Sequence, residues 1–272
     1  MMPLDLRSVD TVRVAAETLA GDPMARFLAG GTILMRLVDN DSGTLQRLVP
    51  SDGLGLDRIE VASGRATIGA AVTMAEIAAH PGLASVKPVA EGIGGPAIRN
   101  MATIGGNLFA RSPYGDFAVA LLALGATAEV EDARGRATVD LSELLAARDR
   151  HEPRIVTSVS FALPSRGAFR FAKAIRRKPH GAAVLSIAAL LPEVAGMFRG
   201  VRIAYGAMAP HPIRASAVER VLEGRAIDPA TIAAALRVAA EGCAPADDAI
   251  ASAWYRTQLV AVHLRRLLAG DG

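Results

Sequence analysis

The spacing of apolar and polar residues divides the chain into short helices and short strands. A first helix is predicted at residues 8–19, where one face carries Val12, Ala15, Ala16 and Leu19. Gly21 and Pro23 then end the helical pattern. The apolar run at residues 26–28 predicts a strand, and two glycines separate it from a second apolar stretch that can start a helix. This order of strand, loop and helix indicates α/β character at the start of the chain.

Turn-forming residues then mark a hairpin and a capped helix. The segments that fit turns or strands are a turn at residues 40–43, a strand at residues 46–50, and a hairpin of residues 57–61 and 66–70. Gly64 lies where the hairpin must turn. Thr73 and Glu76 have the spacing of a capping box, in which the two side chains satisfy the first free N–H groups of a helix. Pro81 and Gly82 close that helix.

The pattern from residue 130 to residue 167 is rich in strands. A second hairpin is predicted around residues 132–135, and Asp140 with Glu143 repeats the capping pattern just after it. Residues 155–163 read as a strand, and the Pro-Ser-Arg-Gly sequence at residues 164–167 is a turn that fits a domain boundary. Strands and short helices alternate without a repeating unit, so the predicted fold class is α+β.

Beyond that turn the pattern changes to strands followed by helices. Strands are predicted at residues 169–174, 182–191 and 201–208, and helices at 214–222, 229–242 and 250–268. Asp228 and Pro229 cap and start the second of these helices. We therefore expect a small antiparallel sheet covered by helices. The predicted domains are residues 1–165, with subdomains of about 1–52 and 53–165, and residues 166–272.

Composition limits the class of protein. The chain has 272 residues, of which 51% are hydrophobic and 21% charged, so it can bury a large core in two domains. Its net charge is +3, its basic residues are scattered except at residues 176–178, and aromatic residues make up only 4%. This is not the basic, stacking surface of a nucleic-acid binder. The apolar runs are too short to span a membrane and the N-terminus lacks the features of a signal peptide, which favours the cytoplasm.

Two glycine-rich stretches are the main candidates for chemistry. They are Ala29-Gly30-Gly31-Thr32 and Thr103-Ile104-Gly105-Gly106-Asn107. Paired glycines beside a hydroxyl residue let several backbone N–H groups point at one anion, and two such loops could hold the two halves of a pyrophosphate. Either loop alone is compatible with an ordinary turn. Neither has the glycine spacing of an ATP-binding or NAD-binding fingerprint.

Other reactive side chains are few. Cys243 is the single cysteine, so the chain alone cannot form an internal disulfide or a cysteine-ligated metal site, and we interpret Cys243 as a small packing residue. His180, His211 and His263 have no metal-ligand spacing, and no metal site is predicted. No nucleophile–base motif is present, so no catalytic residue is predicted. Arg99 and Asn100 are expected to brace a glycine loop.

The stretches taken together resemble a known family. The resemblance rests on the two glycine loops, on Ile98 to Thr103, on Ser112-Pro113-Tyr114-Gly115-Asp116, and on later segments at residues 171–177, 201–206, 209–215, 252–256 and 264–266. In this order they resemble the flavin-binding subunit of the molybdenum hydroxylases. That family includes the medium chain of carbon monoxide dehydrogenase and the FAD domain of xanthine dehydrogenase.

The resemblance implies a fold and a cofactor. The fold would be a two-subdomain FAD-binding domain of the vanillyl-alcohol-oxidase/PCMH type, followed by a small C-terminal domain. The cofactor would be FAD, held at the pyrophosphate by Ala29, Gly30, Gly31, Thr32 and Ile33 and by Thr103, Ile104, Gly105, Gly106 and Asn107. Asp116 would bond a cofactor hydroxyl, although its position also fits the N-cap of a helix beginning at Phe117. Lys173 would lie near the flavin ring, where the alternative is a solvated surface lysine.

The resemblance also implies an electron-transfer role and partners. A large partner subunit would hold the molybdenum cofactor, a small one would carry two [2Fe–2S] clusters, and FAD would pass electrons to a final acceptor. The complex would be a dimer of heterotrimers. The chain departs from the family at residues 35–39, where relatives run toward a lysine, and at Pro179-His180-Gly181, where relatives often have an acidic residue and an aromatic one.

Two alternatives remain open at this point. One is a stand-alone flavoenzyme of the same fold, which would need its own acid and base residues over the flavin. The other is a scaffold subunit that has lost FAD, against which the glycines at 30, 31, 105 and 106 argue. Under the FAD hypothesis, Gly31→Val or Gly106→Val is expected to give folded protein without flavin.

Overall fold

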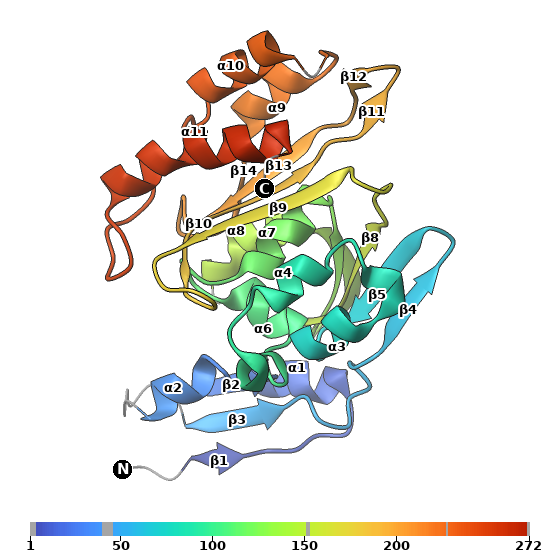
Figure 1. The fold of residues 1–272 in the computed structure, drawn as a ribbon. Helices are drawn as coiled ribbons and strands as arrows, with labels where there is room; N and C mark the ends of the chain where they lie inside the picture. The colour runs from blue at the N-terminus through green and yellow to red at the C-terminus, as the bar shows by residue number, and fades with distance from the viewer. Residues whose placement is uncertain (1–3, 40–45, 151–152, 227, 271–272) are drawn as a thin grey trace.

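The chain folds into three stacked tiers, each built around a sheet (Figure 1). The computed structural model describes residues 4–39, 46–150, 153–226 and 228–270. The turn predicted at residues 40–43 lies outside these residues. Within them, helices and mostly antiparallel sheets alternate along the chain, which confirms the predicted α+β class.

The first tier is a small parallel sheet with helices. Its strands β1 (Asp5–Leu6), β3 (Arg47–Pro50) and β2 (Ala25–Leu28) lie in that order, and both outer strands run parallel to β3. Helices α1 (Val12–Gly21) and α2 (Leu34–Asp39) supply the crossovers that parallel pairing requires. The Thr11 hydroxyl caps α1 by accepting from Val14 N at 3.2 Å. The apolar face predicted for this helix buries Val12, Ala15 and Ala16.

The middle tier is an antiparallel sheet of five strands. Their order is β4 (Ile59–Ala62), β5 (Arg65–Gly69), β8 (Ile155–Ala162), β6 (Thr127–Asp132) and β7 (Gly135–Asp140). The predicted hairpin turns at Ser63 and Gly64, whose φ angles of 50° and 74° are left-handed. The helices that contribute to the core on this sheet are α3 (Met74–Ala79), α4 (Lys87–Glu91), α6 (Ile104–Phe109), α7 (Asp116–Ala123) and α8 (Leu141–Ala147). The short helix α5 (Pro96–Arg99) buries none of its residues and contacts α3. The capping box of Thr73 and Glu76 is present as predicted.

The third tier is a second antiparallel sheet. Its order is β14 (Ile213–Arg214), β13 (Arg202–Gly206), β10 (Ala183–Leu190) and β9 (Phe169–Ile175), with a small hairpin of β11 (Glu193–Val194) and β12 (Met197–Phe198) beside it. Helices α9 (Ser216–Leu222), α10 (Pro229–Arg237) and α11 (Ala253–Ala269) cover one face (Figure 1). The α10 helix ends earlier than predicted, because the Asp228 cap fixes its start but the apolar run to Gly242 continues as turns. The short strand β14 was not predicted.

Helix α7 lies between the two antiparallel sheets. All eight of its residues are buried, and it packs on β10 and β13 of the third tier as well as on the middle tier. A helix that is apolar on every side must be covered on every side. Gly206 of β13 permits the close approach of α7 to the third-tier sheet, since a Cβ there would lie 2.7 Å from Cγ2 of Val119 and 2.3 Å from Oγ of Ser186. The helix thereby joins the two sheets into one core.

Candidate functional site

The first glycine loop connects β2 to α2 and presents free backbone donors. Gly31 has a left-handed φ of 68°, which lets the chain turn from the strand toward the helix. The N–H groups of residues 30–33 donate to no acceptor among the residues that the structure describes. Thr32 is half-buried and Ile33 is exposed. Several free N–H groups within one tight turn fit an anionic ligand, as expected from the sequence.

The second glycine loop differs from that expectation. Thr103 is the N-cap of α6, and its Oγ1 accepts from Gly106 N at 3.1 Å. The N–H groups of Ile104, Gly105 and Asn107 donate to Val72 O, Ala70 O and Thr103 O at 3.0, 2.8 and 3.0 Å. Four of the five backbone N–H groups of the loop, those of residues 104–107, are therefore used inside the protein. What this loop can still offer a ligand is the backbone N–H and the hydroxyl hydrogen of Thr103 and the Asn107 side-chain NH₂ group.

The glycines of both loops are needed first for packing within the protein. A Cβ at Gly30 would lie 1.7 Å from the Met101 carbonyl oxygen, so only glycine allows the first loop to rest on the segment before Thr103. A Cβ at Gly105 would lie 3.0 Å from the Ala70 carbonyl oxygen. At these two positions an added side chain would clash with the backbone of the protein itself. Packing inside the protein, and not the approach of a pyrophosphate as expected from the sequence, is therefore the first reason for glycine there. The same contacts bring the two loops together.

The Asn107 side chain links the second loop to α7. Its Oδ1 accepts from Ala118 N at 3.0 Å in the first turn of that helix. Gly115, with a φ of 99°, is the N-cap of α7, and a Cβ there would lie 3.2 Å from Asn107 O. The alternative role of Asp116 as the N-cap is therefore wrong, because Asp116 is the first residue of the helix. Its carboxylate still lies where the helix dipole favours negative charge.

Asp116 and Lys173 form a buried ion pair between two tiers. Lys173 Nζ lies 2.7 Å from Asp116 Oδ2 and donates to Gly92 O at 2.9 Å. The Lys173 side chain is 12% exposed and the Asp116 side chain 7%, which excludes the solvated surface lysine. Asp116 Oδ1 is buried without a hydrogen-bond partner in the structure. An ionised oxygen without a donor is costly in a protein interior, so this atom is suited to accept from a ligand hydroxyl.

Two groups around the site were not identified from the sequence. The Gly92 carbonyl belongs to a glycine-rich turn that Arg99 braces through the carbonyls of Glu91 and Gly94, at 3.1 and 2.7 Å. Arg148 donates to Ala110 O at 2.9 Å and to Pro210 O at 2.6 Å, and so ties the segment after α6 to the third tier. The turn could have been predicted from the Gly-Ile-Gly-Gly sequence at residues 92–95. No local signal marks Arg148.

Large apolar side chains are exposed around the two loops. They are Ile33, Ile98, Met101, Phe109 and Tyr114. Ile33 belongs to the first loop, and the other four lie within residues 98–114, before and after the second. Exposed apolar side chains beside such loops commonly mark a ligand or interaction site. They fit a cofactor that carries flat aromatic rings in addition to a pyrophosphate.

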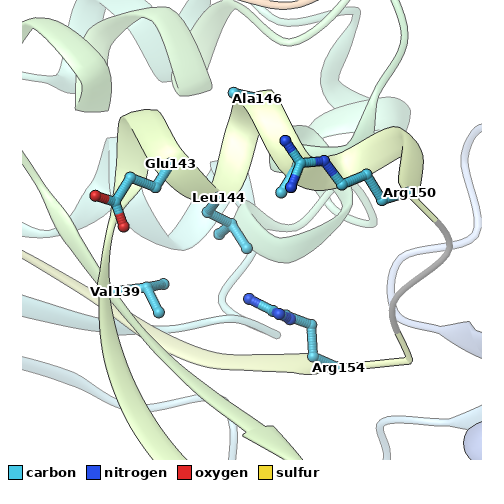
Figure 2. Close-up of a pocket in the computed structure, with 7 residues that line it drawn as sticks. Val139, Glu143, Leu144, Ala146, Arg150 and Arg154 are labelled. Atoms are coloured by element: carbon cyan, nitrogen blue, oxygen red, sulfur yellow. The ribbon is translucent and has the colours of Figure 1, made fainter.

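A separate hollow lies away from these residues (Figure 2). It has a volume of about 420 Å³ and is lined by Val139, Glu143, Leu144, Ala146, Ala147, Arg150 and Arg154. The lining combines the Glu143 carboxylate on one side with Arg150 and Arg154 on the other, so it does not select one sign of charge (Figure 2). The hollow shares no residue with the glycine loops and is not part of the candidate site.

Cys243 and possible metal ligands do not add a reactive centre. Burial raises the pKa of the Cys243 thiol to about 11, so the thiol is protonated at neutral pH and behaves as a packing residue. Among the described residues, no three His, Cys, Asp or Glu side chains are grouped as metal ligands. Within the same ranges, no helix is long and apolar enough to cross a membrane.

The fold and the free polar groups of the candidate site suit a pyrophosphate-bearing cofactor. Free N–H groups at residues 30–33, the unpartnered Asp116 oxygen and the apolar surround all fit FAD. Two family models match the chain: "FAD binding domain in molybdopterin dehydrogenase" over residues 3–164, and "CO dehydrogenase flavoprotein C-terminal domain" over residues 170–270. The chain belongs to this family and is an FAD-binding medium subunit of the molybdenum hydroxylase type. Its cofactor is FAD.

Individual relatives agree with this assignment over nearly the whole chain. The medium chain of carbon monoxide dehydrogenase from Afipia carboxidovorans is 30% identical, with 93% of this chain and 90% of that protein covered. The medium subunit of nicotine 6-hydroxylase from Paenarthrobacter nicotinovorans is 28% identical, with 96% and 95% covered.

Solved structures are similar in fold as well. A chain of carbon monoxide dehydrogenase from Oligotropha carboxidovorans matches with a TM-score of 0.88 at 26% identity, covering 99% of this chain and 98% of that chain. A chain of quinoline 2-oxidoreductase from Pseudomonas putida 86 matches with a TM-score of 0.87 at 26% identity, covering 99% and 97%. The relatives are flavin subunits of oxidoreductases, and the present chain is of the same class.

Proposed function

We propose that this chain passes electrons through FAD from the [2Fe–2S] clusters of a partner subunit to a final acceptor. It would work in a complex with a large molybdopterin-binding subunit and a small iron–sulfur subunit, arranged as a dimer of heterotrimers in the cytoplasm. Similarity over almost the full length to medium subunits of such oxidoreductases supports this role. The observation that carries the proposal is the loop at residues 30–33, whose free N–H groups suit the cofactor pyrophosphate.

Each site residue has a role in holding and tuning the cofactor. The backbone of residues 29–33 would bind the pyrophosphate, and the hydroxyl of Thr103 and the NH₂ group of Asn107 would donate from the second loop. Asp116 would accept from a cofactor hydroxyl through its free oxygen, while Lys173 would supply positive charge near the ring. Bound FAD supplies a centre that exchanges electrons singly or in pairs.

The chain is also proposed to divide functionally near residue 165. The first two tiers, up to about residue 165 with a subdivision near residue 52, would hold most of the cofactor. The third tier, from residue 166, would contribute Lys173 from β9. The ion pair between Lys173 and Asp116 supports a site that needs both parts.

The first experiment is a visible spectrum of the chain purified through an affinity tag from its source. The released cofactor is identified by chromatography, and the co-purifying chains are identified in the same sample. We expect one FAD per chain together with an iron–sulfur chain and a molybdenum chain. A colourless protein that cannot be reconstituted with FAD contradicts the proposal. An isolated chain with FAD that turns over a substrate unaided would instead support a stand-alone flavoenzyme.

A loop variant tests the amide site within the same experiment. Gly31→Val forces a β-branched residue into a left-handed φ and displaces the free N–H groups, so we expect folded protein with little FAD. Gly21→Ala is the matched control, because a Cβ there meets nothing within 4 Å. Full FAD occupancy in Gly31→Val would show that the loop does not hold the cofactor.

A further inference from the structure

Ser186 carries a buried hydroxyl group close to the candidate site. The residue lies in the middle of β10 and is 1% exposed. Its Oγ atom forms no hydrogen bond with any residue that the structure describes. A hydroxyl group that leaves water without gaining a partner costs folding free energy, and the large majority of buried polar side-chain atoms are bonded. Alanine would fill this position without that cost, so the hydroxyl needs a reason beyond packing.

The strand register places Ser186 beside Lys173. Ser186 pairs with Lys173 of β9 on one side and with Gly206 of β13 on the other. Residues directly opposite each other in an antiparallel pair carry their side chains on the same face, with Cβ atoms about 4.5–5.5 Å apart. The Ser186 hydroxyl and the Lys173 ammonium group therefore belong to neighbouring side chains on one face of the third-tier sheet.

This face of the sheet is the one that α7 covers. A Cβ at Gly206 would lie 2.3 Å from Ser186 Oγ and 2.7 Å from Val119 Cγ2, so the hydroxyl lies over Gly206 and against α7. Asp116 is three residues before Val119, on the same side of the helix. Three other side chains on this face of the sheet belong to the apolar core: Phe171, Ala188 and Ala204. Among these described neighbours, the polar groups are those of Asp116 and Lys173.

The Lys173 ammonium group has a donor left for the Ser186 hydroxyl. An ammonium group has three N–H donors. Two of them have acceptors, Asp116 Oδ2 at 2.7 Å and Gly92 O at 2.9 Å, and the third has none among the described residues. Rotation of Ser186 about χ1 to another staggered position moves Oγ from above Gly206 toward β9. There it can accept from the third N–H donor.

We propose that Ser186 is a positioning residue of the flavin site, whose hydroxyl accepts a hydrogen bond from the Lys173 ammonium group. The inference rests on the proposed function and adds a residue to its site. With three acceptors the ammonium group is fixed in place, while the unpartnered Asp116 Oδ1 remains available to the cofactor. A fixed cation near the ring stabilises the negative charge of the reduced flavin. Ser186 therefore raises the flavin reduction potential without contacting FAD itself.

The first test compares Ser186→Ala with wild type in the FAD-loaded protein. Alanine keeps Cβ and removes only the hydroxyl group. The flavin reduction potential is measured by titration against a redox dye, together with the FAD content. We expect Ser186→Ala to keep its FAD and to shift to a more negative potential, so that the ratio of reduced to oxidised flavin at a fixed solution potential falls about fivefold. The matched control is Ser158→Ala, which truncates a half-buried serine of β8 in the middle tier and should match wild type.

A double-mutant cycle tests the hydrogen bond in the chain freed of FAD. Urea midpoints are measured for wild type, Ser186→Ala, Lys173→Met and the double variant. If the hydroxyl bonds the ammonium group, Ser186→Ala lowers the midpoint less in the Lys173→Met background than in wild type. If Lys173→Met does not fold, the reduction potential of Ser186→Ala decides alone.

Two outcomes overturn the inference. One is an unchanged reduction potential in FAD-loaded Ser186→Ala. The other is an equal loss of stability from Ser186→Ala in both backgrounds, because it would assign the residue to packing alone. If the wild-type chain binds no FAD, the proposed function fails, and the urea cycle still decides whether Ser186 bonds Lys173.

Discussion

Lys173 shows how a single residue acquires its role from the fold. The sequence around it predicts a strand, and strand residues of this type are usually solvated. In the structure the neighbouring strand and α7 bury it, and its ammonium group bonds a carboxylate and a carbonyl that come from other parts of the chain. The pair therefore holds the third tier against the first residue of α7.

Removing one partner of the pair formed by Lys173 and Asp116 is expected to lower the stability of the protein strongly. Lys173→Met leaves the Asp116 carboxylate buried without a counter-ion, which should lower the free energy of unfolding by about 3–5 kcal/mol. Urea unfolding at pH 7 measures the change. Asp116→Asn combined with Lys173→Met should lose less than Lys173→Met alone. The control is Lys87→Met, which breaks an exposed pair with Glu91 and should change stability by about 1 kcal/mol or less. An unchanged urea midpoint in Lys173→Met would contradict the coupling.

The glycines illustrate what local sequence can and cannot predict. A loop at Gly30 and Gly31 and a turn at Gly64 were expected from local rules, and both Gly31 and Gly64 have left-handed φ angles. The need for glycine at 30 and 105 comes from backbone at Met101 and Ala70, which the fold brings close. For the same reason the use of the second loop's N–H groups by Ala70 and Val72 could not be predicted, because the acceptors belong to another segment.

At the scale of elements, helix starts were the most predictable feature. The caps at Thr73, Asp140 and Asp228 all accept from backbone N–H groups near the expected helix starts. Helix ends were less predictable, as at α10, because turns after a helix can remain apolar when a neighbouring element covers them. The order of strands in the sheets depends on pairings between distant segments, and no local pattern encoded it.

The connection before α11 is held by one buried arginine. Arg256 is 1% exposed and donates to Val184 O, Ala246 O and Ala251 O as well as to both oxygens of Asp248. Burial opposes ionisation of Asp248, but hydrogen bonds from Ala251 N and Arg256 outweigh it and lower the pKa of this carboxyl. The ionised form is therefore preferred in the folded state.

This shift predicts how acid affects the third tier. Because the folded pKa is lowered, the stabilisation from Asp248 is complete above the unfolded pKa of about 4 and is lost as the pH falls through the folded pKa. Asp248→Asn should therefore be less stable than wild type at pH 7, and the difference should shrink as the pH falls below about 4. Urea midpoints of both proteins between pH 7 and pH 3 measure it. A difference that stays constant with pH would contradict the shift.

At the scale of the whole molecule, α7 connects the two antiparallel sheets. Its first residue, Asp116, belongs to the proposed cofactor site, and its later residues pack on β10 and β13. A disturbance on the third-tier side of the helix should therefore reach the cofactor. Family resemblance predicted that both parts of the chain would be present, but the continuous core between them became evident only from the structure.

Gly206→Ala tests this connection. A Cβ at Gly206 would crowd Oγ of Ser186 and Cγ2 of Val119, which should cost about 1–3 kcal/mol of unfolding free energy and weaken FAD binding. Gly21→Ala, where a Cβ meets nothing within 4 Å, is the control for both measurements. Stability is measured by urea unfolding and FAD affinity by flavin fluorescence. Two separate unfolding transitions, with only one of them shifted, would show that the tiers are independent.

The position of α7 also limits how such a chain can change by recombination. A gene cut in the linker at residues 164–168 would leave α7 with its β10 and β13 face exposed to water, and would leave the third sheet without one of its two covers. Exchange of C-terminal parts between related genes would thus require matching small residues at positions such as Gly206. We expect the two parts to be inherited as one unit, even though the linker itself would tolerate a break.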